Sequence, residues 1–139
     1  MATQSVSETI TGIATKLIPL SVIETVDRLQ RLLVSKGMKV FGVIDQRTEA
    51  RNVGLELRET VLVQFGSPLA GTPIMDAVPL AAMDRPLKIL IWQGDDATMV
   101  SYVAPAELAA RYGIPQSLAT NLAGFISVTD ALSVSILTD

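Results

Sequence analysis

The chain has 139 residues, 49% of them apolar and 18% charged, and a net charge of −3; this length suits one domain, residues 1–139, with a real hydrophobic core. Cysteine and histidine are absent, which excludes disulfides, thiolate nucleophiles, imidazole catalysis and metal sites built from these two residues. The eleven basic residues are scattered and aromatic residues make up only 4%, which argues against a nucleic-acid partner.

The high apolar content raises the question of a membrane segment. The longest stretch without charge lies between Arg111 and Asp130, and it holds two glycines, a proline and several amide and hydroxyl side chains. Such a stretch is too polar for a membrane-spanning helix. The first ten residues have neither a basic start nor an apolar run, so no secretory signal is predicted. We therefore expect a cytoplasmic domain that does not enter a membrane and covers apolar surface by self-association.

Apolar side chains recur with the spacing of strands or of helices, and glycine and proline mark the ends of most elements. In chain order, the predicted elements are a strand at 9–18, a helix at 21–37, a strand at 38–45, a helix at 46–54, a strand at 59–65, short helical turns beginning at Pro73 and Pro79, strands at 87–92 and 98–103, a helix at 105–113, and a long terminal helix from about Gln116, with strand as the minority interpretation of its last residues.

The order of these elements predicts the fold class. The first strand is expected at the edge of a sheet, and the nearly continuous apolar run at 59–65 is expected to be a central strand covered on both faces. Strands joined mostly by short turns, with a long helix near each end, predict an α+β fold. We expect helices to cover one face of a mostly antiparallel sheet.

Two helix starts carry capping signals. Ser21, followed three residues later by Glu24, forms a capping box, and Gly37 is a natural C-terminal stop for that helix. Asp45 is placed to cap the short helix that follows it. A general acid or base at Asp45 is the alternative hypothesis, but a capping residue needs no such role, and we favour the cap.

The stretch VLVQFGSPLAGTPIMD, residues 61–76, raises the question of a phosphate-binding loop. Gly66 and Gly71 have the spacing of a Walker A motif. However, Thr72 stands where that motif has lysine, and Pro73 where it has a hydroxyl group. The prolines of this stretch also remove backbone donors from the presumed cradle. We therefore reject a nucleotide-binding loop.

A simpler interpretation treats the same residues as a corner of the fold. Gly66 ends a strand, Ser67 and the proline after it turn the chain away from the sheet, and Thr72 caps a helical turn. The amides at that helix start remain able to bind an anionic or polar ligand without any lysine.

Two segments of the chain, VDRLQRLLVSKGMKVFGVID and ARNVGLELRETVLVQFGSPLAGTPIMDAVPLAAMDRPLKILIW, resemble the bacterial and archaeal family known as domain of unknown function 302. The resemblance runs from about Ser21 to Tyr102, and its most distinctive part pairs Phe-Gly-x-Pro with Gly-Thr-Pro-x-Met. It implies a curved antiparallel sheet gripped by helices, similar to the topology of the TATA-binding protein, and commonly a homodimer, but it implies no activity. The matching positions are Asp45, Arg58, Phe65, Gly66, Pro68, Gly71, Thr72, Pro73, Met75 and Lys88.

The chain also departs from the pattern of that family. Gln46 stands where the family usually has histidine, Glu59 where it usually has proline, and Ser67 where it usually has asparagine. A glutamine amide forms hydrogen bonds but does not titrate. A role that this chain shares with the family is therefore expected to be binding or assembly rather than acid–base catalysis.

We expect a non-catalytic homodimeric domain that binds a small apolar or weakly polar molecule or a partner protein, with no cofactor and no metal. The strand ends around the loop at 66–73 are expected to form the rim of the site. The expected ligand-binding residues are Asp45, Arg58, Gly66, Ser67, Gly71, Thr72 and Met75. Two alternatives remain open: a small hydrolase or isomerase that uses Asp45 or Glu49 as a base buried in a cleft, and a purely structural subunit of an assembly.

Overall fold

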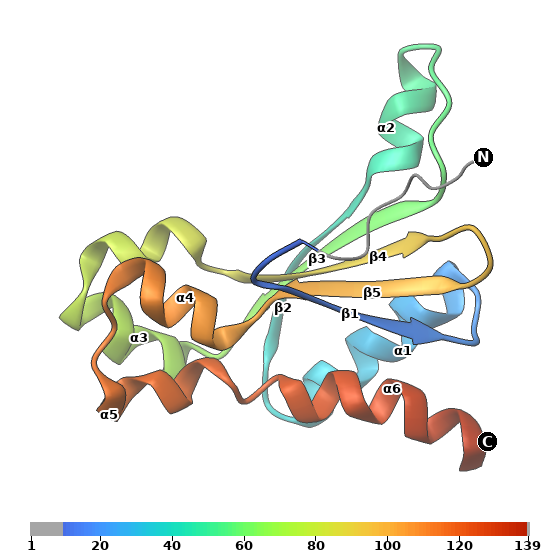
Figure 1. The fold of residues 1–139 in the computed structure, drawn as a ribbon. Coiled ribbons are helices and arrows are strands. Elements are labelled where there is room, and N and C mark those ends of the chain that lie inside the picture. The colour runs from blue at the N-terminus through green and yellow to red at the C-terminus, as the bar shows by residue number, and fades with distance from the viewer. Residues whose placement is uncertain (1–9, 139) are drawn as a thin grey trace.

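Five antiparallel strands form one sheet in the order β1-β5-β4-β3-β2 in the computed structural model, which describes residues 10–138 (Figure 1). The strands are β1 (Ile13–Ile18), β2 (Lys39–Asp45), β3 (Thr60–Gly66), β4 (Leu87–Gln93) and β5 (Thr98–Val103). The helices are α1 (Val22–Ser35), α2 (Gln46–Asn52), α3 (Pro68–Ala77), α4 (Pro105–Tyr112), α5 (Gln116–Ala119) and α6 (Ile126–Thr138), with the 3-10 helices η1 (Pro79–Asp84) and η2 (Thr120–Leu122). The predicted α+β class is confirmed. The first predicted strand begins at Thr9, which lies outside the described range. The prediction that no secretory signal is present concerns the first ten residues, of which the structure describes only Ile10.

Helices cover one face of the sheet, as the sequence predicts. α1 and α6 lie against that face, while α3, α4, α5 and η1 gather at one end of the sheet (Figure 1). The core lies between these layers, and each large apolar side chain buried there stabilises the fold by about 1.5–3 kcal/mol. Its fully buried side chains include Leu29, Leu33, Val63, Phe65, Ile89, Ile91, Val100, Val128 and Leu132.

Aromatic rings tie the start of α6 to the sheet. Phe125, which precedes α6, packs edge-on against Phe65 of β3 and Tyr102 of β5, with ring centroids 5.4 and 5.2 Å apart. Edge-to-face pairs of this kind are favourable beyond the area that they bury. They fix the C-terminal helix on the same face of the sheet as α1.

Both predicted capping signals are confirmed. In α1, the Ser21 hydroxyl accepts a hydrogen bond from the Glu24 N–H, and the Glu24 carboxylate accepts one from the Ser21 N–H, each at 3.1 Å. Gly37 follows the helix in the left-handed region, with φ of 79°. Asp45 caps α2, since its Oδ1 accepts a 3.0 Å hydrogen bond from the Thr48 N–H.

The corner after β3 differs from the prediction. Helix α3 begins directly after Ser67, whose Oγ accepts a 3.2 Å hydrogen bond from the Ala70 N–H. Pro68 takes the first helical position, where its missing N–H costs nothing. The prediction that Thr72 caps a later turn was therefore wrong, because Ser67 and Pro68 already supply the cap and the first residue. Pro73 lies inside the helix.

The C-terminal segment also differs from the prediction of one long helix. It is divided into α5, η2 and α6, and Gly124 lies in the break before α6. Glycine weakens a helix interior by about 1 kcal/mol, and the break lets Phe125 turn into the core. Helix α6 continues to Thr138, so the minority prediction of a terminal strand was wrong. The side chain of Ile136 lies outside what the structure describes.

Strand β3 was predicted to be central and covered on both faces, and only the second expectation was wrong. β3 is an interior strand of the sheet, paired with β2 on one side and with β4 on the other. Val61, Val63 and Phe65 point to the helices and are buried, whereas Leu62 and Gln64 point to the other face and are only half-buried. The apolar run therefore includes side chains that no helix of the described residues covers. The expectation that the first strand lies at the edge was correct.

The uncovered face of the sheet has a consistent composition. Residues paired across neighbouring strands share a face, so the pairing register identifies its members. We call this surface the open face; it consists of Ile13, Thr15, Leu17, Lys39, Gly42, Ile44, Thr60, Leu62, Gln64, Gly66, Lys88, Leu90, Trp92, Met99, Ser101 and Val103. Lys39 and Lys88 are its two charged residues, and most of the others are apolar.

Residues 46–59, which we call the arm, project beyond the sheet on the side away from α1 and α6 (Figure 1). The arm contains α2 and the segment that returns to β3, and α2 buries none of its residues. Val53, Leu55 and Leu57 are 72%, 62% and 40% exposed. The arm thus carries apolar side chains that nothing in the described chain covers.

Candidate functional site

A hollow of about 290 Å³ lies where β3 passes into α3. Four of the predicted site residues border it together, namely Gly66, Ser67, Thr72 and Met75. Phe41, Pro68, Arg85 and Pro86 complete its lining. We call this cavity the Arg85 hollow. Gly71, a fifth predicted residue, is not part of the lining but lies next to the guanidinium group of Arg85.

Gly71 makes room for the guanidinium group of Arg85. A Cβ atom built on Gly71 would lie only 2.0 Å from Nη2 of Arg85, whereas one on Gly66 would lie 3.6 Å from it. The first distance is far inside van der Waals contact, and the second is ordinary contact. Any side chain at position 71 would therefore displace the guanidinium group from the surface of α3.

Arg85 is the residue of this site that sequence reasoning missed. Its Nη1 atom is buried and has no hydrogen-bond partner among residues 10–138. Burial lowers the pKa of Arg85, whereas the pKa of Arg111 is raised, first by its hydrogen bond to Asp84. The sequence does hold a signal: Arg85 is the one basic residue between Arg58 and Lys88. An isolated cation in a long apolar stretch is a candidate for a buried charge.

The other two predicted residues, Asp45 and Arg58, lie at the opposite end of β3. Arg58 donates a 3.1 Å hydrogen bond to the Gln93 carbonyl and lies 3.7 Å from Asp95. Asp45 pairs with the first half of β3 rather than with its end. Eight residues separate Arg58 from Gly66, which is roughly 25 Å of extended chain. The structure thus divides the expected rim into two separate regions.

Asp45 does not have the surroundings of a general base. It is exposed, and its pKa is lowered, first by the backbone hydrogen bond from Thr48. It borders a second hollow, of about 310 Å³, between α1 and the ends of β2 and β3. A base that works near neutral pH needs the opposite shift, produced by burial. Glu49, the other carboxylate considered, is also exposed.

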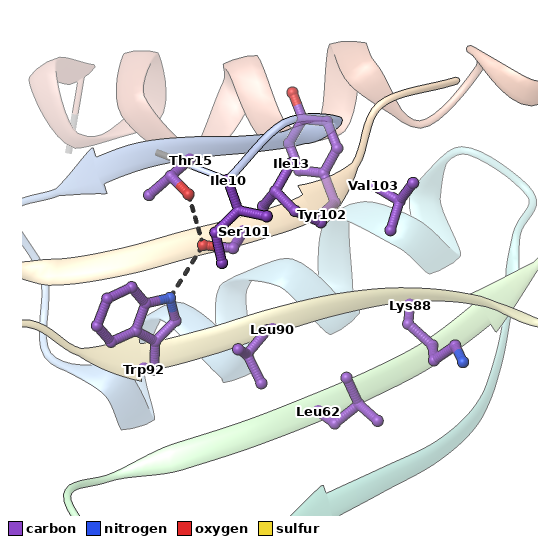
Figure 2. Close-up of a pocket in the computed structure, with 10 residues that line it drawn as sticks. All are labelled: Ile10, Ile13, Thr15, Leu62, Lys88, Leu90, Trp92, Ser101, Tyr102 and Val103. Carbon is purple, nitrogen blue, oxygen red and sulfur yellow. Dashed lines mark hydrogen bonds between the residues drawn. The ribbon is translucent and has the colours of Figure 1, made fainter. Parts of the chain in front are cut away.

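The third cavity, of about 380 Å³, lies on the open face (Figure 2). Trp92 and Leu90 of β4, Leu62 of β3 and Val103 of β5 line it, together with Ile10, Ile13 and others. The Trp92 Nε1–H donates a 2.9 Å hydrogen bond to Ser101 Oγ, and Ser101 Oγ lies 2.8 Å from Thr15 Oγ1. Because these polar groups satisfy one another, the floor of this cavity behaves as an apolar surface.

Two further properties bear on the kind of protein. Within residues 10–138, acidic side chains do not gather in groups of three or more that would hold a metal ion. Over the same range, no helix is both long enough and apolar enough to cross a membrane.

Fold and cavities together define a small α+β protein with an open sheet face and an arginine-bordered hollow. The family model described as "Domain of unknown function DUF302" matches residues 14–132, and the chain belongs to this family. The resemblance found in the sequence is therefore confirmed. A crystal structure of an uncharacterized conserved DUF302 protein from Bacillus stearothermophilus has the same fold, with a TM-score of 0.77 and 17% identity, over 90% of this chain and 98% of that one.

Curated relatives come from Brucella. Fluoride-specific ion channel FluC 1 of Brucella suis biovar 1 (strain 1330) is 35% identical over 95 residues, which are 68% of this chain and 37% of that protein. Fluoride-specific ion channel FluC 2 of Brucella melitensis biotype 1 is also 35% identical over 95 residues, which are 35% of its length. The chain thus spans about a third of the curated relatives that it matches.

Proposed function

We propose that the chain is a cytoplasmic, non-catalytic binding domain that acts as a homodimer, with a second copy docked on the open face. One observation carries this proposal: β3 and β4 have apolar side chains on both faces, but helices cover only one. Strands with this pattern are typical of sheets covered on both sides. A second copy of the chain supplies a cover of the same apolar character.

The size of the open face supports an interface that includes the arm. Strands about 4.8 Å apart, each six or seven residues long at about 3.3 Å per residue, give five strands an area of about 500 Å². A stable interface buries about 800 Å² on each partner. The arm, which rises beside the open face (Figure 1), adds the exposed side chains of Val53, Leu55 and Leu57 to the same surface.

Charge also favours a second copy over a strongly charged partner. The charged residues on the open face are two lysines, Lys88 on β4 and Lys39 at the start of the edge strand β2. Two such faces meeting about a two-fold axis bring apolar side chains together and leave each lysine free to reach the rim with its flexible stem. A highly charged partner would find few groups on this face to pair with.

Sedimentation velocity over a range of concentrations tests the dimer. We expect the wild type to dimerise at micromolar concentration, and Leu17→Glu and Leu62→Glu to be monomeric because each places a carboxylate on the open face. Leu80→Glu is the matched control, since Leu80 is 71% exposed on η1 and outside that face. Trp92, the single tryptophan of the chain, reports burial of the face by its emission. A wild type that stays monomeric at 100 µM or so, or a control that dissociates equally, would contradict the proposal.

The Brucella relatives favour a second candidate role. They are named as fluoride-specific ion channels, and about a third of each corresponds to this chain. We infer that a domain of this kind accompanies such a channel and supports its assembly. Removing the matched region from the Brucella suis relative tests the role: reduced fluoride conduction supports it, and unchanged conduction with unchanged channel assembly contradicts it.

A further inference from the structure

We propose that the Arg85 hollow binds a small organic carboxylate, with the guanidinium group of Arg85 as its anion-binding group and an apolar wall around the rest of the molecule. The inference rests on a different group from the homodimer, because Arg85, the anion-binding group, is not part of the sheet. Of the residues that line the hollow, Gly66 is the one that the pairing register places on the open face.

The first support is an unpaired charge. Four other arginines lie within 4 Å of a carboxylate, namely Arg31, Arg51, Arg58 and Arg111. Among the residues that the structure describes, Arg85 has no such partner, and its Nη1 is buried without a hydrogen bond. A charge removed from water is costly unless it is paired. An anion in the hollow would balance this charge through the part of Arg85 that lines the hollow, rather than through the buried Nη1 itself.

No nearby carboxylate of the described residues pairs with Arg85. Asp84 precedes Arg85 in the chain, but its carboxylate is engaged by Arg111 at 2.9 Å and by the hydroxyl group of Tyr112. The residues that line the hollow include no aspartate or glutamate. Arg47 also has an orphaned Nε atom, but its charge acts on Asp45, whose pKa it helps to lower. Arg85 is the cation that faces a cavity without an acidic wall.

The second support is the shape of α3 beneath the guanidinium group. Alanine is preferred over glycine inside a helix, yet position 71 holds glycine, and a Cβ atom there would collide with Nη2 of Arg85. The helix is therefore open at the point where the guanidinium group rests on it. This packing holds the group at the edge of the hollow.

The lining of the hollow indicates the class of ligand. Phe41, Pro68, Met75 and Pro86 form apolar walls, and the hydroxyl groups of Ser67 and Thr72 lie at the helix end of the cavity. Lys39 lies over the Phe41 ring, with Nζ 5.1 Å from the centroid, and adds positive charge nearby. A guanidinium group binds a carboxylate through two parallel hydrogen bonds.

The volume of the hollow and the charge of its lining restrict the class of ligand further. A cavity of about 290 Å³ is at the lower end of the range for small-molecule sites. Arg85 is the one cation among the lining residues, and Lys39 is not one of them, so a singly charged carboxylate is matched better than a doubly charged phosphate. Apolar walls favour a ligand whose remaining atoms are a ring or a short aliphatic chain.

Titration calorimetry with benzoate, benzyl alcohol and inorganic phosphate tests the proposal on the full chain. We expect saturable benzoate binding, and binding of benzyl alcohol at least about tenfold weaker because it lacks the charge-assisted hydrogen bond. Phosphate is expected to bind at least about tenfold more weakly than benzoate because it has no ring to fill the space between the apolar walls. Arg85→Gln is expected to weaken benzoate binding by the same factor. Arg58→Gln removes an equal charge at the far end of β3 and is expected to leave the affinity unchanged.

Gly71→Ala provides a second variant that keeps the charge. The added methyl group is expected to displace the guanidinium group and weaken benzoate binding, and the Arg85 Nε–Hε signal in ¹H–¹⁵N spectra reports that displacement in a folded protein. The benzoate affinity of Leu62→Glu is expected to equal that of the wild type, which separates this site from the dimer. Equal benzoate affinity in Arg85→Gln and wild type, or equal loss in Arg58→Gln, would overturn the proposal, as would phosphate binding as tightly as benzoate.

Discussion

Arg85 is a residue whose position favours binding at the expense of stability. Its guanidinium group is partly removed from water, and burial lowers its pKa. An apolar side chain of similar length would fill the same space beside α3 and would not hold a desolvated charge. Functional sites commonly keep such unfavourable groups, and replacing them raises stability while it removes function.

Arg85→Met is therefore expected to raise the free energy of unfolding by about 1 kcal/mol in the absence of ligand. Urea denaturation followed by circular dichroism measures this change. Arg58→Met is the control, because Arg58 is exposed and surface substitutions usually change stability by less than about 0.5 kcal/mol. A less stable Arg85→Met protein would show that Arg85 has a structural partner after all.

Asp84 gives a prediction about pH. Its pKa is lowered below the ordinary 3.8, first by the hydrogen bond from the Tyr112 hydroxyl group and then by Arg111. A carboxyl group whose pKa is lower in the folded protein contributes stability above its unfolded pKa, and this contribution is lost as the pH falls through the folded value. We expect the free energy of unfolding to fall as the pH drops from about 5 towards 2.

Tyr112→Phe isolates this contribution, because it removes the hydroxyl donor and leaves the ring. The variant is expected to be less stable than the wild type at pH 7 and to lose less stability on acidification, so the two curves converge at low pH. Denaturation at a series of pH values measures both curves. Parallel curves for the two proteins would mean that Asp84 does not contribute to the acid sensitivity.

At the scale of elements, prediction from sequence succeeded where a local rule decides the structure. The capping box of α1 and the Asp45 cap of α2 depend on hydrogen bonds between residues three apart, which the sequence displays directly. The strands predicted at 87–92 and 98–103 form an antiparallel hairpin, β4 and β5, whose turn contains Gly94, Asp95 and Asp96.

Elements were mispredicted where two local rules competed or where a distant contact decided the outcome. Both Ser67-Pro68 and Thr72-Pro73 have the pattern of a cap followed by a first helical proline, and the earlier pair begins α3. The apolar spacing after Gln116 suits a long helix, but the contact of Phe125 with Phe65 and Tyr102 accompanies a break. These ring contacts join residues far apart in sequence, so spacing along the chain does not reveal them.

The candidate site shows the same limit. Gly66, Ser67, Thr72 and Met75 lie close in sequence, and the structure keeps them at one hollow. Arg85 reaches that hollow from beyond η1, and Asp45 and Arg58 are carried to the other end of β3. Sequence reasoning therefore finds residues grouped by a short loop. It does not find those that the antiparallel sheet brings near or takes away.

For the whole molecule, the apolar composition of the chain has a physical explanation in the open face and the arm. The mean hydropathy is +0.42. Leu17 on the open face and Val53, Leu55 and Leu57 on the arm are exposed in a single copy, as are apolar side chains on α1, α3 and η1. Contiguous apolar surface of this kind marks sites of interaction. In the proposed homodimer the open face and the arm of each copy are buried together. Burial in the dimer would then account for the apolar side chains that a single copy leaves exposed.

A substitution in the arm tests the proposed dimer interface without changing the stability of the single chain. Leu55 is 62% exposed and lies beyond the sheet, so Leu55→Glu is expected to change the unfolding free energy of the monomer by less than about 0.5 kcal/mol. If the arm of one copy packs on the other, the same change is expected to raise the dimer dissociation constant at least about tenfold, because a carboxylate would be buried without a partner. Sedimentation velocity measures the dissociation constant, with Val34→Glu on α1 as the equally exposed control. A dimer that tolerates Leu55→Glu but not Leu62→Glu would place the interface on the open face alone. In that case the arm would contribute nothing to the interface, and the open face of each copy would make all of the contact with the other copy.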